Sequence, residues 1–147
     1  MNTQFATTWR ILLLVAIAAI VSLAACSGLG ADALRDTAWD LTSLAGGDLL
    51  PGTSITIEFA ADQVSDSAGC NNYGGSYKAA GNSLNLVDLY ATEMGCLEPA
   101  GILEQETAFL TALRSAASYQ IDGRRLEILD ETGTNGLVFI ASSSDLE

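Results

Sequence analysis

Apolar and polar residues alternate along most of the chain after residue 36, which is the pattern of β-strands with one buried face. The clearest case is the series Ile55, Ile57 and Phe59, which alternates with polar or small residues. Clusters of Gly, Asn and Asp interrupt the alternation and predict tight turns. We therefore expect seven or eight short strands, drawn from residues 37–44, 55–60, 63–68, 73–79, 83–89, 119–121, 126–128 and 137–140.

One segment departs from this alternation, because its apolar residues recur at spacings of three and four. Acids lie in its first turns and an arginine lies near its end, so the segment predicts an amphipathic helix whose charges match the helix dipole. The polar face lacks the Lys and Arg residues of helices that lie on membranes, which favours packing against the strands. The apolar positions are Ile102, Leu103, Phe109, Leu110, Leu113, Ala116 and Ala117, and the opposite face carries Glu104, Gln105, Glu106, Thr111 and Arg114.

Short connections between strands favour antiparallel pairing, because parallel strands need long crossovers. The strands and the single helix together predict an α+β domain, in which one amphipathic helix packs against a mostly antiparallel sheet. The 147 residues are enough for one such domain beside an N-terminal targeting segment.

The N-terminal segment has a different character from the rest of the chain. Its first ten residues are largely polar and end in Arg10, and Ile11–Ala25 is a run of small or apolar residues. That run is shorter than the roughly twenty residues of a membrane-spanning helix and fits a secretory signal. The ending Leu23-Ala24-Ala25-Cys26 resembles the lipobox of bacterial lipoproteins, in which the cysteine receives a diacylglyceryl group and becomes the mature N-terminus.

These features predict a lipoprotein signal peptide over residues 1–25, lipidation of Cys26 and a flexible lipidated tether over residues 26–35. Two or three acyl chains hold a protein firmly to a bilayer, so the membrane is an expected partner through the N-terminal lipid. The domain is expected to be exported, anchored to the cell membrane or outer membrane, and to face the periplasm or the cell exterior. An uncleaved anchor helix, with Cys26 incidental, is the alternative.

Composition narrows the chemistry that the chain can perform. The sequence has 18 acidic and 6 basic residues, a net charge of −12, and no histidine. An acidic surface repels nucleic acid, so no nucleic-acid partner is expected. The lack of histidine removes the commonest general base and the commonest metal ligand. We interpret the charge as a solvated surface that resists aggregation, with binding of a basic partner or of cations as the alternative.

Cys70 and Cys96 remain as a pair once Cys26 is lipidated. Export places them in an oxidising compartment, where a disulfide is the default expectation. Closure of the loop between them would stabilise the fold by roughly 3–4 kcal/mol. Reactive thiols are the alternative, but the sequence offers neither a Cys-x-x-Cys spacing nor a histidine to lower a thiol pKa. A zinc site is weaker still, because two cysteines leave the metal short of ligands.

Five motifs follow one another along the chain: Trp39-Asp40-Leu41, Ile55-Thr56-Ile57-Glu58-Phe59, Gly69-Cys70-Asn71-Asn72-Tyr73-Gly74-Gly75-Ser76-Tyr77, Thr92-Glu93-Met94-Gly95-Cys96 and Glu104-Gln105-Glu106-Thr107-Ala108-Phe109-Leu110. Together they resemble the META domain, or HslJ-like, family, a domain of unknown function found in bacterial lipoproteins. The resemblance places the domain at residues 36–141, followed by a polar tail at 142–147.

The resemblance implies a partly open, β-barrel-like sheet of about 7–8 short strands with one helix packed against it. It also implies a cell-envelope location and an association of bacterial members with stress and antibiotic tolerance. No enzymatic activity is established for the family, and we expect no catalytic residue, metal site or cofactor.

Asn71, Asn72, Tyr73 and Tyr77 are the candidate binding residues of the third motif. They have two interpretations: the asparagines satisfy backbone groups in a turn while the tyrosines cover a strand face, or all four line a concave binding surface. Turn chemistry alone accounts for the asparagines, so the structural interpretation is favoured.

These observations predict a membrane-anchored, non-catalytic lipoprotein that acts as a binding or envelope-stress and antibiotic-tolerance module, with an unknown envelope protein or lipid as partner. The alternative is a pilot- or carrier-like module that binds an acyl chain or a partner peptide in its barrel, in a cavity lined by Ile55, Ile57, Leu84 and Leu86. An envelope hydrolase is the third hypothesis and requires converging carboxylates in a cleft.

Overall fold

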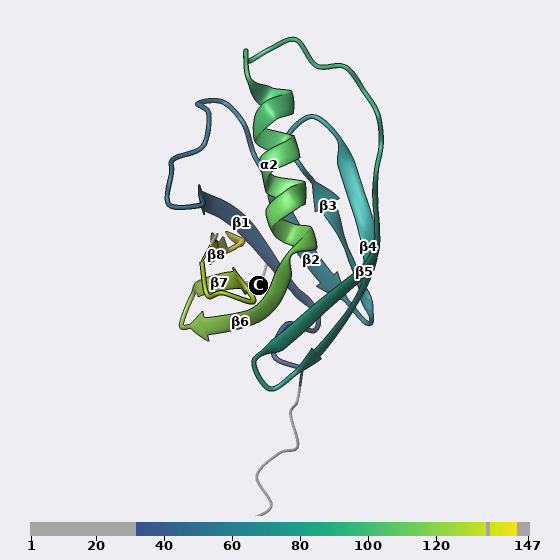
Figure 1. Ribbon diagram of the computed structural model, residues 1–147, viewed down its shortest axis with the longest axis vertical. Coiled ribbons are helices and arrows are strands. Elements are labelled where there is room, and N and C mark those ends of the chain that lie inside the picture. Colours follow the sequence, from purple (N-terminus) through teal and green to yellow (C-terminus); the bar gives the residue numbers. More distant parts are fainter. Residues whose placement is uncertain (1–31, 135, 144–147) are drawn as a thin grey trace, which may run out of the picture.

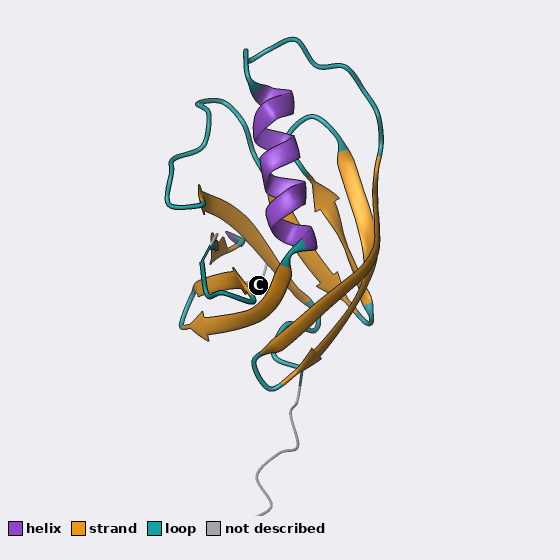
Figure 2. Ribbon diagram, in the orientation of Figure 1, coloured by secondary structure: helices purple, strands orange, loops and turns teal. Residues whose placement is uncertain are grey.

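In the residues that it describes, 32–134 and 136–143, the computed structural model shows an eight-stranded antiparallel β-barrel with one helix packed against it (Figures 1 and 2). Each strand pairs with the next in sequence, and β8 pairs with β1 to close the sheet. The predicted α+β class and antiparallel sheet are therefore confirmed. The strands are β1 (Thr37–Leu44), β2 (Thr56–Ala60), β3 (Gln63–Ser67), β4 (Asn72–Ala80), β5 (Ser83–Ala91), β6 (Ala116–Asp122), β7 (Arg125–Asp130) and β8 (Leu137–Ala141).

The barrel interior is filled by the apolar residues whose alternation predicted the strands. Ile55, Ile57 and Leu84 are at most 1% exposed and belong to one continuous core. The same core holds Phe59 of β2 and Phe139 of β8, both completely buried. Because large side chains occupy these positions, the apolar cavity that a carrier function would need is disfavoured.

β5 and β6 have fewer residue pairs in register than any other two neighbouring strands. One residue pair, Ser83 and Ser118, is in register there, and the backbone N–H of Tyr119 donates to the carbonyl of Asn82 at 2.8 Å. The helix contacts β5 and β8. The sheet that was expected to be partly open is thus closed, with a single residue pair in register between β5 and β6.

Helix α2 (Ile102–Arg114) lies across the barrel (Figure 1). It carries Glu104 in its first turn and Arg114 in its last turn, the charge arrangement that the helix dipole favours. Its buried face consists of Ile102, Glu106, Phe109, Leu110 and Leu113. Within the described part of the chain, no helix has the length and apolarity needed to cross a bilayer.

The end of the helix differs from the prediction. Ala116 and Ala117 were expected on its apolar face, but they begin β6, where Ala116 pairs with Asp130 of β7. The helix stops at Arg114, and the backbone N–H of Ser115 closes the last turn on Thr111 and Ala112. Alanine fits helix and strand alike, so its spacing continued the helical pattern beyond the helix itself.

The start of the domain also differs from the prediction, because residues 32–35 belong to the fold and not to a tether. Leu34 is completely buried in the core, and a carboxylate oxygen of Asp32 accepts a 2.6 Å hydrogen bond from the Tyr77 hydroxyl. At the other terminus, Ser142 bonds Ala38 and Asp40 of β1, so the predicted polar tail begins inside the sheet. The predicted signal peptide and Cys26 lie outside the described residues.

The two ends of the barrel are distinct. The proximal end holds residues 32–36, where Arg35 donates to the carbonyl of Ala61 in the β2–β3 turn and Asp36 accepts from the backbone N–H of Ala61. The distal end holds the turn before β4, the β1–β2 loop and the start of α2. Figure 1 shows the described chain starting at the proximal end and α2 starting at the distal end. The candidate site lies at the distal end.

Candidate functional site at the distal end of the barrel

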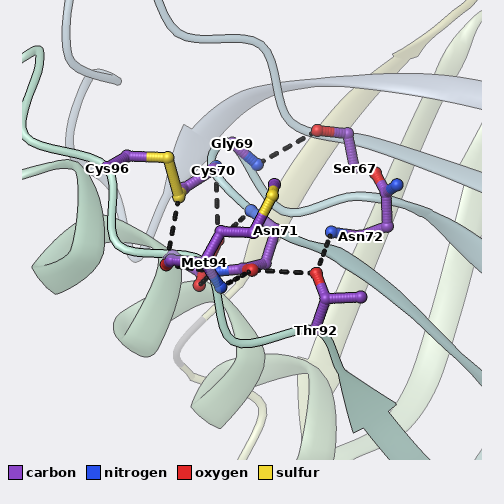
Figure 3. Close-up of a disulfide and its surroundings, with 9 residues drawn as sticks. Ser67, Gly69, Cys70, Asn71, Asn72, Thr92, Met94 and Cys96 are labelled. Carbon is purple, nitrogen blue, oxygen red and sulfur yellow. Dashed lines mark hydrogen bonds between the residues drawn. A yellow bond between two sulfur atoms is a disulfide. The ribbon is translucent and has the colours of Figure 1, made fainter.

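A disulfide between Cys70 and Cys96 joins the turn before β4 to the loop between β5 and α2 (Figure 3). We call this loop, residues 92–101, the distal loop. The two Cα atoms are 5.9 Å apart, within the usual range for a disulfide. The predicted disulfide is therefore present, and it fixes the middle of a loop that belongs to no helix or strand.

The side chain of Asn71 fastens the same loop by hydrogen bonds. Its Oδ1 accepts from the backbone N–H of Met94 at 2.7 Å and from the Thr92 hydroxyl at 2.8 Å. Its Nδ2 donates to the carbonyl of Met94 at 3.2 Å and to the Glu106 carboxylate at 2.7 Å. Asn71 is 2% exposed and uses both of its donors and both acceptor positions, so its amide has a structural role.

Glu106 is the acidic partner of this turn. One carboxylate oxygen, Oε2, accepts from the backbone N–H groups of Asn71 at 2.6 Å and Cys70 at 3.2 Å, while Oε1 accepts from Asn71 Nδ2. The side chain is 7% exposed, and a buried carboxylate is tolerated only when such donors replace its hydration. Glu106 therefore couples α2 to the cysteine-bearing turn.

The neighbouring residue on the helix fastens a second loop. Gln105 Oε1 accepts from the backbone N–H of Leu50 at 2.6 Å, and its Nε2 donates to the Thr53 hydroxyl at 3.0 Å. Both partners lie in the loop between β1 and β2. Two adjacent side chains near the start of α2 thus hold two separate segments of the distal end.

The burial pattern of Asn71, Asn72, Tyr73 and Tyr77 fits the structural interpretation that the sequence favoured over a shared binding surface. Asn71, Tyr73 and Tyr77 are at most 3% exposed, and only Asn72 of the four is exposed. The Tyr73 hydroxyl donates to the carbonyl of Thr56 at 2.9 Å, inside the barrel wall. Turn geometry and core packing account for Asn71, Tyr73 and Tyr77, while the Asn72 side chain lies at the surface.

Burial also sets the acidity of the tyrosines. It raises the pKa of Tyr73 well above its usual value, with a smaller contribution from the charge of Asp66. It likewise raises the pKa of Tyr77, whose hydroxyl bonds Asp32 at the proximal end, and that of Tyr119. The ring of Tyr73 packs edge-on against Phe109 of α2, with ring centroids 5.4 Å apart. These phenols are therefore held neutral as structural groups.

Sequence patterns missed both Glu106 and the exposed apolar residues of the distal loop. Glu106 was assigned to the polar face of the helix, yet it lies four residues after Ile102 and three before Phe109, a spacing that places it on the buried face. The pattern of the helix alone thus contained the signal. Leu97 is 87% exposed and Met94 is 56% exposed, and no periodicity indicates this because the loop is irregular.

The hydrogen bonds among the polar groups of this site limit the chemistry that it can support. The polar side chains at the turn donate to and accept from one another, which leaves a rigid staple in place of a free acid, base or nucleophile. In the described ranges, no three Cys, Asp or Glu side chains come together in a way that could hold a metal ion. What the distal end offers to solvent is the outer surface of the stapled loop and of the first turns of α2.

Comparison with known proteins agrees with this fold. A family model described as META domain matches residues 32–143. An NMR structure of a protein from Burkholderia xenovorans is similar, with a TM-score of 0.60 and 30% identity over 75% of this chain and 84% of that one. A crystal structure of a DUF4847-family protein from Bacteroides vulgatus shares the fold, with a TM-score of 0.52 and 16% identity over 74% of this chain and 94% of that one. No curated protein matches the sequence at a significant level.

Proposed function

This chain belongs to the META domain family, and from that premise we propose that it is a lipid-anchored protein of the cell envelope. In this proposal Cys26 carries the lipid after removal of residues 1–25. The domain then acts as a non-catalytic binding module, in a role related to envelope stress or antibiotic tolerance.

The opposite placement of the chain start and the staple carries this proposal. Asp32 and Leu34 lie at the proximal end, shortly after Cys26 in sequence. A lipid on Cys26 would hold the proximal end near the bilayer and leave the distal end facing away from it. The distal end is also the part that the Cys70–Cys96 disulfide and Glu106 make rigid. A rigid surface loses little conformational entropy on binding, which suits a binding module.

The pairing of the polar groups supports a non-catalytic role. Glu106 is the buried carboxylate of the site, and both of its oxygens already accept hydrogen bonds from Cys70 and Asn71. A general acid or base needs a free position for the reacting proton. The hydrogen bonding of Glu106 therefore gives no support to the hydrolase hypothesis. The filled core described above gives none to the carrier hypothesis.

The anchor is tested by fractionating the natural host of the chain with the wild-type protein and with Cys26→Ser. The wild type is expected in the membrane fraction, and Cys26→Ser is expected in the soluble fraction because it cannot receive the diacylglyceryl group. A Cys70→Ser/Cys96→Ser chain, which keeps the lipobox, serves as the matched control and should remain in the membrane. Membrane association of Cys26→Ser would contradict the lipid anchor.

The cellular role is tested in a strain that lacks the chain. Under envelope-directed antibiotics, wild-type protein should restore survival, while Cys26→Ser at equal abundance should not. Equal survival with and without the wild-type gene, across several classes of envelope stress, would contradict the proposed role.

A further inference from the structure

The distal end carries exposed apolar side chains on a loop that cannot withdraw them. Leu97 is 87% exposed and Met94 is 56% exposed, and Cys96 between them is held by the disulfide. Both backbone polar groups of Met94 are bonded to Asn71, so its side chain is directed outward from a fixed backbone. Exposed apolar side chains on a pinned segment are typical of binding surfaces, because ordering costs are already met.

The first turns of α2 follow this loop directly in sequence and also expose an apolar side chain. Leu103 is 38% exposed there, and a hollow of about 410 Å³ is lined by Leu103, Glu104, Thr107 and Ala108. We call the six residues Glu93, Met94, Leu97, Glu98, Leu103 and Glu104 the distal surface. It combines three apolar side chains with three exposed acids.

The charge of this region has one sign. The sequence contains no Lys or Arg between Lys78 and Arg114, so the segment that carries the distal surface contains acidic residues and no basic residue. A group of negative charges repels an acidic protein or an anionic membrane and attracts a basic group. The complementary occupant presents apolar side chains together with Lys or Arg.

The position of the surface selects between a lipid and a protein. Figure 1 shows the start of α2 and the distal loop at the end of the barrel opposite to the beginning of the described chain. Arg35 and Asp36 bind the β2–β3 turn at that proximal end, as described above. A membrane anchor near residue 26 would therefore keep the distal surface away from its own bilayer.

We propose that the distal surface is a docking site for a protein segment that is both apolar and basic, in which Leu97 and Met94 insert among apolar side chains and Glu93, Glu98 and Glu104 pair with Lys or Arg. This inference rests on the proposed binding function and specifies its partner. The lipid anchor serves only to disfavour a lipid occupant, and the binding measurements below do not require it, so the two proposals are tested separately.

The test uses the full-length exported chain in non-ionic detergent as bait for a phage-displayed library of random 12-residue peptides. The strongest selected peptide is then synthesised in its original form and with each Lys and Arg replaced by Glu. Dissociation constants are measured for the wild type, for Leu97→Ser and Met94→Ser, and for Ile140→Ser as a control. Ile140 is 45% exposed on β8, away from the distal loop, and so reproduces the loss of an exposed apolar side chain.

The selected peptides should be enriched in Lys or Arg and in large apolar residues. Leu97→Ser and Met94→Ser should each weaken binding about tenfold or more, as loss of a central apolar contact does. Ile140→Ser should leave the affinity unchanged, and the Glu-substituted peptide should not bind. Because exposed charge pairs are screened by salt, affinity for the original peptide should fall as sodium chloride is raised.

A second comparison isolates the charges. Glu93→Lys/Glu98→Lys/Glu104→Lys should abolish binding, while Glu58→Lys/Asp122→Lys/Glu131→Lys, which makes the same charge change at exposed positions elsewhere, should retain it. Peptides that are acidic or uncharged, or that bind Leu97→Ser as well as wild type, would overturn the proposal. A lipid-binding result would also overturn it. In that result the Cys26→Ser chain floats with phosphatidylcholine vesicles and the added Leu97→Ser substitution prevents flotation, which would show that the distal surface binds lipid.

Discussion

The backbone N–H of Asn71 donates a 2.6 Å hydrogen bond to the buried carboxylate of Glu106, across 35 positions of sequence. The same carboxylate accepts from the backbone N–H of Cys70. One side chain of α2 therefore takes the place of the water that would hydrate two backbone N–H groups in the turn that carries the disulfide. The rigidity of the distal end therefore depends on α2 as much as on the covalent bond.

The first prediction concerns this carboxylate. Glu106→Gln should lower the free energy of unfolding by about 2–4 kcal/mol, because it removes charge-assisted hydrogen bonds and turns an NH₂ group toward a donor in a buried site. Equilibrium unfolding in urea at pH 7 measures the change. Glu104→Gln makes the same substitution two positions earlier on the exposed side of the helix, and it should change the stability by less than about 0.5 kcal/mol. Equal effects of the two variants would contradict the assigned role of Glu106.

The second prediction compares two adjacent asparagines. Asn71→Asp places a carboxylate oxygen where Nδ2 now lies 2.7 Å from Glu106, and it also removes a donor to Met94. An unpaired buried charge beside a like charge should destabilise the fold by about 3–5 kcal/mol. Asn72→Asp introduces the same charge at an exposed position and should cost less than about 1 kcal/mol. Thermal unfolding of both variants at neutral pH distinguishes them, and similar melting temperatures would argue against the network around Asn71.

The third prediction concerns alkaline pH. Burial raises the pKa of Tyr73, Tyr77 and Tyr119 in the folded chain, so the folded state keeps protons that the unfolded chain releases above its usual tyrosine pKa of about 10. The unfolded state then binds fewer protons than the native state, so stability must fall as pH rises through and beyond about 10. The stabilisation that these tyrosines contribute is fully present below that pH.

The measurement uses Tyr90→Phe, which removes the exposed phenol and leaves these three tyrosines. Tyrosinate absorbance near 295 nm should rise together with the loss of near-ultraviolet circular dichroism, in one cooperative alkaline transition. Gradual ionisation of three phenols in a chain that keeps its native dichroism would show that they are not buried as described.

The sequence predicted the strands well because a barrel wall buries every second residue, and the alternation of Ile55, Ile57 and Phe59 is a direct record of that geometry. The bounds of the helix failed where Ala116 continued its spacing, since alanine fits both kinds of element. Asn71 and Asn72 are adjacent residues of the same type, yet Asn71 is buried and Asn72 is exposed. Their difference depends on contacts with segments 20 or more positions away, which no local pattern encodes.

The start of the domain was misplaced for a similar reason. A short stretch rich in Ala, Gly and Asp resembles a linker in composition, yet Leu34 inserts into the core and Asp32 meets the hydroxyl of Tyr77. A single buried leucine is too weak a periodic signal to reveal a folded segment. The cysteine pair was predictable because it rested on redox chemistry and an even count, neither of which needs a three-dimensional contact to be known.

The last prediction concerns two glycines where β4 and β5 approach closely, at a point where their register shifts. A methyl group on Gly75 would lie 2.9 Å from the carbonyl oxygen of Val87 and 2.8 Å from the side chain of Leu89. A methyl group on Gly74 would meet instead the phenol of Tyr90, at 2.6 Å from its oxygen. Tyr90 is 65% exposed and can rotate into solvent, whereas the backbone of β5 cannot move without breaking the ladder.

Gly75→Ala should therefore lower the free energy of unfolding by about 2–3 kcal/mol, as overpacking against backbone does, and Gly74→Ala by about 1 kcal/mol or less. Gly95→Ala is the control, because nothing lies within 4 Å of its added methyl group, and it should change stability by less than about 0.5 kcal/mol. Guanidinium unfolding of the three variants, together with Gly74→Ala/Tyr90→Ala, provides a double-mutant cycle. The cost of Gly74→Ala should vanish once Tyr90 is truncated, because the phenol is the group that the methyl displaces. If that cost persists in the double variant, or if Gly74→Ala is as harmful as Gly75→Ala, the constraint lies in the backbone of β4 and not in the ring that covers it.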